Sequence, residues 1–219
     1  MAKHISIVFP GQGSQSIGML DQFSNVDILS SGYDTDIFSF DLLDIISTDE
    51  EKLNQSQYTQ PALVLSSHLY FRKLTKLLSD KFNLLAGHSL GEFSALVAAG
   101  VLSFEEGLNL VAIRAKAMQK SCENTKGTMA AILALENEVI ENICHETNGI
   151  VVAANYNCPG QVVISGEVNA IKEACLKLTK VGARRALILP VGGAFHSPLM
   201  EDAKEKLSIA INNSYFNQP

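Results

Sequence analysis

One serine of this sequence lies in a pattern that is typical of a nucleophile. Residues 87–91 read Gly-His-Ser-Leu-Gly, with a short apolar run before them and a helical pattern after them. A tight turn from a strand to a helix forces its central residue into a strained conformation and exposes that side chain. Flanking glycines give such a turn room, and the backbone N–H of Leu90 would point to where an oxyanion forms. The pattern predicts that Ser89 is a nucleophile, with an ordinary serine in a glycine-flanked turn as the alternative.

A serine hydroxyl is a poor nucleophile until a base takes its proton. The candidate bases are the five histidines, His4, His68, His88, His145 and His196. His196 stands in an irregular loop after a strand-like run, and active-site residues often lie in such loops. His88 adjoins Ser89, but neighbouring side chains in such a turn point apart, so we expect His88 to pack or to steady the turn. We favour His196 as the base, although a lone loop histidine is more often a surface residue.

The order of the candidate residues argues against a standard esterase. An α/β-hydrolase places an acidic residue between its serine and its histidine in the chain. No Asp or Glu between Ser89 and His196 stands out at the end of an expected strand. A backbone carbonyl or an amide would then orient the histidine.

The segments around Ser89 predict an α/β body with a parallel sheet. The expected elements of this body are strands over 5–9 and 82–86 and helices over 62–78, 92–99 and 103–120. Pro61 would lie in the first turn of its helix. Ser103 and Glu106 form a capping box for the last helix. Residues 20–60 are polar and mixed, with weak helical patterns only.

The segment between this body and the His196 loop has a different order of expected strands and helices. Its expected elements follow the order βαββαβ, over 128–135, 138–147, 150–154, 161–165, 168–181 and 185–189. That order is the ferredoxin-like arrangement. We therefore expect a ferredoxin-like insert over 126–190, between two parts of the α/β body, 1–125 and 191–219.

Composition and charge limit the function classes. The chain has 219 residues, of which 47% are hydrophobic and 18% charged, and a net charge of −6, which argues against nucleic acid as a main partner. No apolar run approaches the ~20 residues that span a bilayer, and no signal peptide precedes the first strand. We expect a cytoplasmic protein with no membrane partner. The four cysteines fit no zinc pattern, so we expect free thiols and no metal site.

Six stretches together resemble one family. They are residues 9–15 (FPGQGSQ), 59–62 (TQPA), 87–92 (GHSLGE), 114–119 (RAKAMQ), 155–161 (NYNCPGQ) and 194–197 (AFHS). In this order they are similar to the malonyl-CoA:acyl-carrier-protein transacylases of bacterial fatty acid synthesis and the related acyltransferase domains of polyketide synthases. The resemblance spans nearly the whole chain. It implies a hydrolase-like α/β body with a ferredoxin-like insert, as the pattern of elements also predicts.

The resemblance implies roles in the chemical step. Ser89 would be acylated, and His196 would be its base. The backbone N–H groups of Gln12 and Leu90 would form the oxyanion hole. Without the family, the Gly-Gln-Gly loop over 11–13 is a weak glycine-loop signal that is equally open to phosphate binding.

The resemblance also implies a binding pocket. Arg114 would bind the free carboxylate of a malonyl group, although an Arg on a helix is usually solvated. Phe195 would fill the space of an α-methyl group, because related polyketide domains pair Ala-Phe-His with malonyl and Ala-Ser-His with methylmalonyl. Gln60 and Met118 would be pocket walls, with plain core residues as an equal alternative.

The implied reaction moves a malonyl group from malonyl-CoA to the phosphopantetheine thiol of an acyl carrier protein, in fatty acid biosynthesis. Coenzyme A would be part of the substrate, and no cofactor would be bound. Carrier proteins of this kind are acidic, and a candidate patch for them comprises Lys172, Lys177, Lys180, Arg184 and Arg185. The alternative for that patch is an ordinary solvated charged face that binds no partner.

The family's usual C-terminus lies well beyond residues 217–219 of this chain. The further segment would complete the α/β body and carry the carbonyl that orients His196. A non-catalytic remnant that binds an acyl-CoA or a carrier is therefore one alternative function. A thioesterase-like editing enzyme is another, against which Arg114 and Phe195 argue, because editing of longer acyl groups needs no carboxylate clamp.

Overall fold

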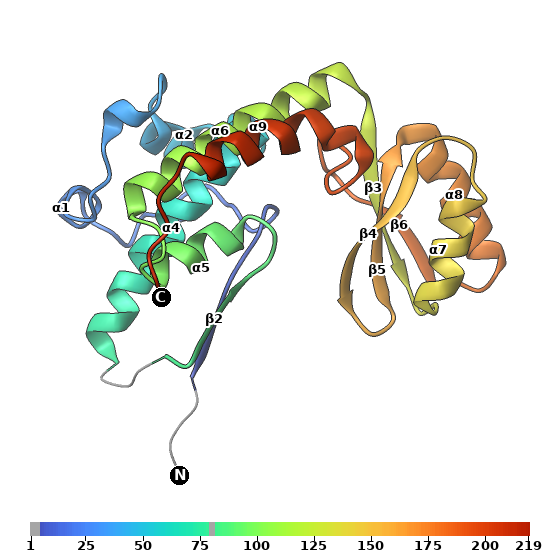
Figure 1. The fold of residues 1–219 in the computed structure, drawn as a ribbon, viewed down its shortest axis with the longest axis horizontal. Coiled ribbons are helices and arrows are strands. Elements are labelled where there is room, and N and C mark those ends of the chain that lie inside the picture. Colours follow the sequence, from blue (N-terminus) through green and yellow to red (C-terminus); the bar gives the residue numbers. More distant parts are fainter. Residues whose placement is uncertain (1–4, 79–81) are drawn as a thin grey trace, which may run out of the picture. The chain divides into compact units, whose positions relative to one another are not determined.

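The computed structural model describes residues 5–78 and 82–219. The chain divides into two compact units, which we describe separately (Figure 1). The first unit comprises 1–116 and 207–219, and the second comprises 117–206. The second unit includes the predicted insert, together with part of helix α6 (Phe104–Asn124), the His196 loop and the start of helix α9 (Glu201–Asn212). The domain bounds 126–190 stay a prediction.

The sheet of the first unit is parallel, as predicted. Strand β1 (Ser6–Phe9) pairs with β2 (Leu84–Gly87), and the register sets Phe9 opposite Gly87. Helix α5 (Gly91–Ala98) follows β2 directly. Because parallel strands end at the same edge of a sheet, the loop after β1 and the turn after β2 leave the sheet together. The two segments that carry Gln12 and Ser89 are thus brought side by side by the register.

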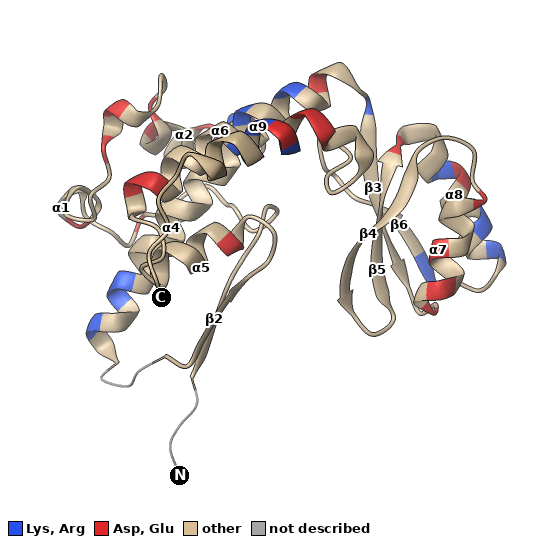
Figure 2. Cartoon of the chain, in the orientation of Figure 1, with Lys and Arg blue, Asp and Glu red and all other residues tan. Residues whose placement is uncertain are grey.

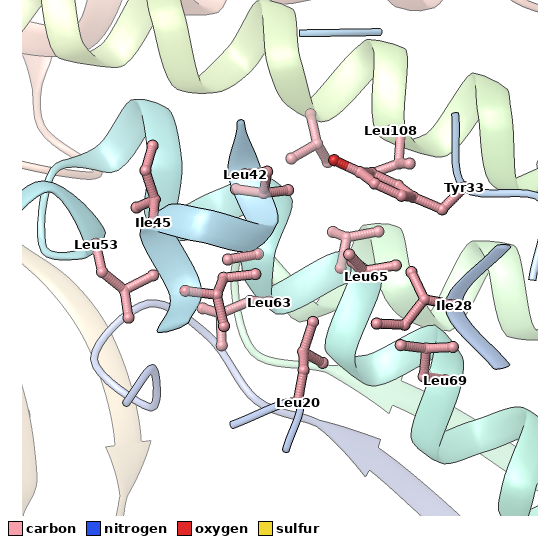
Figure 3. Packing of buried hydrophobic residues seen from close by; sticks show 14 of the residues in the cluster. Leu20, Ile28, Tyr33, Leu42, Ile45, Leu53, Leu63, Leu65, Leu69 and Leu108 are labelled. Atoms are coloured by element: carbon pink, nitrogen blue, oxygen red, sulfur yellow. The ribbon is translucent and has the colours of Figure 1, made fainter. Parts of the chain in front are cut away.

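Residues 20–60 form more structure than their pattern predicts. They contain helices α1 (Asn25–Leu29), α2 (Leu42–Thr48) and α3 (Glu50–Leu53) and the 3₁₀ turn η1 (Thr35–Ile37). These helices are too short for a clear period, and side-chain caps begin them: the Asp41 carboxylate accepts from the Asp44 N–H, for example. The core of the first unit includes residues of this segment, of α4 and of α6, such as Leu42, Leu65 and Leu108 (Figure 3).

Helix α4 (Ser56–Leu77) begins earlier than the sequence predicts. We expected Pro61 in its first turn, but Pro61 lies inside the helix. The start is hard to read because Gln55, the N-cap residue, provides no side-chain cap. The Thr59 hydroxyl instead donates to the carbonyls of Leu53 and Gln55, 2.5 and 3.0 Å away, and so holds the first turn. The corrected start places Ser56 and Gln60 one above the other on the same helix.

The second unit has the predicted βαββαβ order. Its elements are β3 (Gly127–Leu133), α7 (Asn137–His145), β4 (Val151–Cys158), β5 (Gln161–Glu167), α8 (Val168–Lys180) and β6 (Arg185–Ile188). The strands form one antiparallel sheet in the order β4-β5-β3-β6. Most bounds lie within about two residues of those expected, but β4 continues to Cys158, beyond the predicted end at 154.

The sheet of the second unit is buried on both faces. On one face Ile132 and Ile164 pack in a cluster with residues of α7 and α8. On the other face Met129 and Val163 pack in a cluster with Phe195 and other residues of α6, α9 and the His196 loop. Two residues that the sequence assigned to the pocket, Met118 and Phe195, therefore pack against this sheet.

No helix within 5–78 or 82–219 is both long and apolar enough to cross a membrane.

The expected capping box is present at the start of α6, where the Glu106 N–H donates to the Ser103 hydroxyl over 3.1 Å. This capping confirms the predicted start of the helix that carries Arg114.

Candidate active site

Ser89 occupies a strained turn between β2 and α5. Its φ is 53°, in the left-handed region that side chains other than glycine rarely adopt. A Cβ at Gly87 would lie 2.0 Å from the backbone of Gly91, and a Cβ at Gly91 would lie 2.2 Å from the Phe9 carbonyl oxygen. Both flanking positions therefore require glycine. The strand, turn and helix around Ser89 agree with the context that the motif predicts.

The backbone around Ser89 is held between the start of α5 and strand β1. Leu90 is the N-cap residue of α5, so its N–H belongs to the helix end where N–H groups lack intrahelical acceptors. His88 donates its backbone N–H to the Phe9 carbonyl over 3.0 Å, which ties the turn to β1. Its side chain is exposed. The turn presents Ser89 while its backbone is held by the neighbouring strand.

Arg114 is buried next to Ser89. Only 9% of the residue is exposed, and its Nη2 donates to the Ser89 hydroxyl oxygen over 3.1 Å. Its Nη1 donates to Gln60 Oε1 over 2.6 Å, and the guanidinium carbon lies 6.0 Å from the centre of the Phe93 ring. The alternative of a solvated helix arginine is therefore wrong.

Within 5–78 and 82–219, no carboxylate forms a salt bridge with Arg114. The salt bridges among the described residues all involve lysines. Burial lowers the pKa of the Arg114 guanidinium to about 10, and the charge of Glu92 partly opposes that shift. A buried guanidinium whose partners are neutral is prepared to accept an anion, because an anion would supply the missing charge.

Gln60 connects Arg114 to the loop after β1. Gln60 is fully buried, and its Nε2 donates to Gln12 Oε1 over 3.4 Å. Gln12 in turn donates from Nε2 to the Ser56 hydroxyl oxygen over 3.0 Å. The sequence indicated Gln60 and Gln12 only through motifs, and no motif indicated Ser56 or Phe93.

The second unit holds the other predicted site residues. His196 is exposed and has φ of 57°, so it shares the left-handed conformation of Ser89. Phe195 and Met118 are each 7% exposed and pack in one apolar cluster. The Ser197 hydroxyl donates to the Ala194 carbonyl over 2.6 Å and closes the loop around His196. Strained residues of this kind are concentrated at functional sites, a signal that the sequence does not carry.

The predicted basic patch lies on α8 and β6. Helix α8 carries three lysines and one acidic residue, Glu173 (Figure 2). Lys172, Lys180, Arg184 and Arg185 are exposed. Lys177 is half-buried, pairs with Glu173 over 2.9 Å and donates to the Glu146 carbonyl. Its charge is partly neutralised, so the exposed basic group is smaller than the sequence suggests.

The residues around Ser89 offer hydrogen-bond donors. Within 5–78 and 82–219, no three His, Cys, Asp or Glu residues come together as a metal site would require. The described cysteines are free thiols. In the first unit, a serine in a strained turn thus lies within hydrogen-bond distance of a buried positive charge.

Comparison with known proteins agrees with this geometry. A family model described as "Acyl transferase domain" matches residues 7–219. The malonyl CoA-acyl carrier protein transacylase of Haemophilus influenzae is 40% identical over 99% of this chain and 72% of its own length. The transacylase structure from Coxiella burnetii has a TM-score of 0.93 and 37% identity, with coverage of 100% of this chain and 71% of the other.

A second solved structure shows a relative with its partner. It is a malonyl-transacylase in complex with a type II polyketide synthase acyl-carrier protein, with a TM-score of 0.92 and 38% identity. It covers 99% of this chain, which spans 72% of the relative. By the family match, the identity to these relatives and the agreement of the fold, this chain belongs to the acyl transferase domain family and is an acyltransferase.

Proposed function

We propose that this chain transfers a malonyl group from malonyl-CoA to the phosphopantetheine thiol of an acyl carrier protein, through a malonyl ester of Ser89. The observation that carries this proposal is the buried Arg114, whose Nη2 lies 3.1 Å from the Ser89 hydroxyl oxygen. A cation at that distance from the nucleophile favours an acyl group with its own negative charge. The relatives named as malonyl CoA-acyl carrier protein transacylases support the same substrate.

The first half of the reaction loads the serine. His196 takes the proton of Ser89 as Oγ attacks the thioester carbonyl. The N–H groups of Gln12 and Leu90 stabilise the oxyanion of the tetrahedral intermediate. The C–S bond then breaks, the coenzyme A thiolate leaves with the proton from His196, and malonyl-Ser89 remains.

The second half of the reaction unloads the serine. The phosphopantetheine thiol gives its proton to His196 and attacks the ester carbonyl. The C–O bond to Ser89 breaks, and the proton returns to Oγ. The same N–H groups stabilise both intermediates. Because coenzyme A leaves before the carrier thiol attacks malonyl-Ser89, the exchange follows ping-pong kinetics.

Selection of malonyl follows from the burial of Arg114. The carboxylate would form two parallel hydrogen bonds with the guanidinium. An acetyl group would leave the buried charge without a counterion, which costs on the order of several kcal/mol. Gln60 orients the guanidinium, and Phe195 and Met118 limit the space at the α-carbon. The contact with Arg114 supports the role of Gln60, and the resemblance to the family supports those of Phe195 and Met118.

An acidic carrier protein would dock on the exposed basic group of the second unit, where Lys180 and Arg184 are the residues to test. Charge reversal at both should raise the apparent KM for the carrier and leave malonyl-CoA loading unchanged. We place the reaction in fatty acid biosynthesis, in the cytoplasm, with a coenzyme A thioester as substrate and no resident cofactor.

Intact mass spectrometry after mixing with malonyl-CoA tests the proposal. We expect one malonyl adduct on the parent chain and none on Ser89→Ala, with Ser94→Ala, which alters a buried serine of α5, as a matched control. An adduct on Ser89→Ala would refute the nucleophile. An adduct that hydrolyses as fast as it forms would instead favour the thioesterase alternative, and binding without an adduct would favour the non-catalytic one.

A further inference from the structure

The structure points to a positioning residue that the sequence motifs do not include. We propose that Ser56 is the terminal acceptor of a hydrogen-bond chain from Arg114 and that it holds the Gln12 loop in place for the chemical step. The inference rests on the proposed function, since it assigns Gln12 to the oxyanion hole. Ser56 is the first residue of α4 and is 4% exposed.

The chain comprises three hydrogen bonds. Arg114 Nη1 donates to Gln60 Oε1 over 2.6 Å, and Gln60 Nε2 donates to Gln12 Oε1 over 3.4 Å. Gln12 Nε2 then donates to the Ser56 hydroxyl oxygen over 3.0 Å. Gln12 is 44 positions from Ser56 and 48 positions from Gln60 in the sequence. The three bonds thereby connect the Arg114 helix, α6, to the start of α4.

The direction of the chain follows from chemistry. A guanidinium has donors only, so Gln60 must present its carbonyl oxygen to Arg114. The amide nitrogen of Gln60 must then face Gln12, which has to present its own oxygen. The amide nitrogen of Gln12 is left to face Ser56, and the last residue of the chain must accept a hydrogen bond. A hydroxyl meets that requirement, and alanine does not.

Burial makes the last acceptor important. Ser56 is 4% exposed and Gln12 is half-buried, so water has reduced access to the hydrogen bond between them. A half-buried donor that loses its acceptor keeps part of its desolvation cost. Without the Ser56 hydroxyl, we expect the Gln12 amide to turn away in search of another acceptor and to move its loop.

The Gln12 loop lies against the nucleophile turn without spare room. A Cβ at Gly11 would lie 2.6 Å from the His88 carbonyl oxygen and 2.8 Å from His88 Nδ1. The Ser14 hydroxyl donates to the Gly11 carbonyl over 2.7 Å. Oxyanion donors act only when they are placed to within a fraction of an ångström. A small movement of Gln12 therefore lowers the rate of the chemical step.

The same contacts predict which kinetic parameter changes. Arg114 keeps its bonds to Gln60 and Ser89 when Ser56 is altered, so binding of the malonyl carboxylate is preserved. The oxyanion exists only in the transition state and the intermediate. Loss of the Ser56 acceptor should therefore lower the maximal loading rate, kcat, and leave the half-saturating concentration of malonyl-CoA, KM, unchanged.

The test is the time course of malonyl-adduct formation on the full chain, at several concentrations of malonyl-CoA. Ser56→Ala should load about five- to tenfold more slowly at saturation, with the same final occupancy and half-saturating concentration. Ser56→Thr, which keeps the acceptor, should restore the parent rate. Ser66→Ala makes the same change at another buried serine of α4, outside the chain, and should load like the parent.

Several results would overturn the proposal. They are a parent-like rate in Ser56→Ala, an equal slowing in Ser56→Thr or Ser66→Ala, and a lower final occupancy, which would indicate simple loss of folded protein. If the parent itself forms no adduct, the proposed function fails and the role of Ser56 falls with it. If the parent loads and Ser56→Ala loads equally fast, only the role of Ser56 is wrong.

Discussion

Two of the strained residues of this acyltransferase, Ser89 and His196, have nearly the same φ, 53° and 57°, but different surroundings. The turn of Ser89, in the first unit, is crowded by backbone atoms that cannot move independently. The loop of His196, in the second unit, follows Phe195, which is held in an apolar cluster. Backbone crowding tolerates no added atom, whereas side-chain packing can adapt. Substitutions at the glycines of the Ser89 turn should therefore abolish function, and substitutions of Phe195 should adjust it.

The largest effect is expected at the Ser89 turn. Gly91→Ala adds a Cβ 2.2 Å from the Phe9 carbonyl oxygen and should cost about 3 kcal/mol or more in stability, along with all malonyl loading. Gly192→Ala, in the His196 loop, meets no atom within 4 Å and should change stability by about 0.5 kcal/mol or less. Far-UV circular dichroism in urea suits the measurement, because the chain has no tryptophan. Equal losses in both variants would remove the contrast between turn and loop.

Arg114 should show the next largest effect. Arg114→Ala removes a positive charge that contacts the Ser89 hydroxyl, and should lower kcat/KM for malonyl-CoA about 100-fold or more. Loading from acetyl-CoA should not fall. Arg114→Lys keeps a charge without the planar fork and should give an intermediate value. An unchanged ratio of malonyl to acetyl loading in Arg114→Ala would show that another group selects the substrate.

Substitution of Phe195 tests whether the side-chain packing next to His196 can adapt. Phe195→Ser should cost about 2–4 kcal/mol in stability, because a side chain that is 7% exposed leaves a cavity. It should also raise loading from methylmalonyl-CoA relative to malonyl-CoA about tenfold, by opening space beside the α-carbon. Phe195→Leu retains most of the packing and serves as the control. No gain of methylmalonyl loading would count against Phe195 as the residue that limits the pocket.

A smaller effect is expected on the pH dependence of stability, through His68. His68, in the first unit, stacks on Phe104 with ring centres 4.0 Å apart, and burial lowers its pKa to about 4. The unfolded chain takes up this proton near pH 6.5, before the folded chain does, so stability should fall as pH drops from about 6.5 to 4 and level off below. The loss at pH 5 should be about 1–2 kcal/mol. His68→Asn should lose this part of the pH dependence, and an unchanged slope would exclude His68 as its source.

The sequence predicts well what is regular or carried by motifs. The βαββαβ order and the Ser89 turn follow from alternation, helical periodicity and two glycines. The start of α4 could not be found, because Gln55 offers no cap and Pro61 suggested a later start. The bond between Gln12 and Ser56 joins positions 44 residues apart and leaves no local pattern. Short capped helices and polar contacts between distant positions are thus the parts that could not be predicted from the sequence.

The double-sided burial of β5 also bears on mutational tolerance. A strand with one solvated face accepts polar residues at every second position, but Val162, Val163 and Ile164 are all buried. In a saturation library, these positions should reject charged residues without the usual alternation. Ser165 should be an exception, since its buried hydroxyl oxygen is among the described side-chain atoms without a hydrogen-bond partner. Replacement by alanine removes that unsatisfied group, so Ser165→Ala should be enriched where its neighbours are depleted.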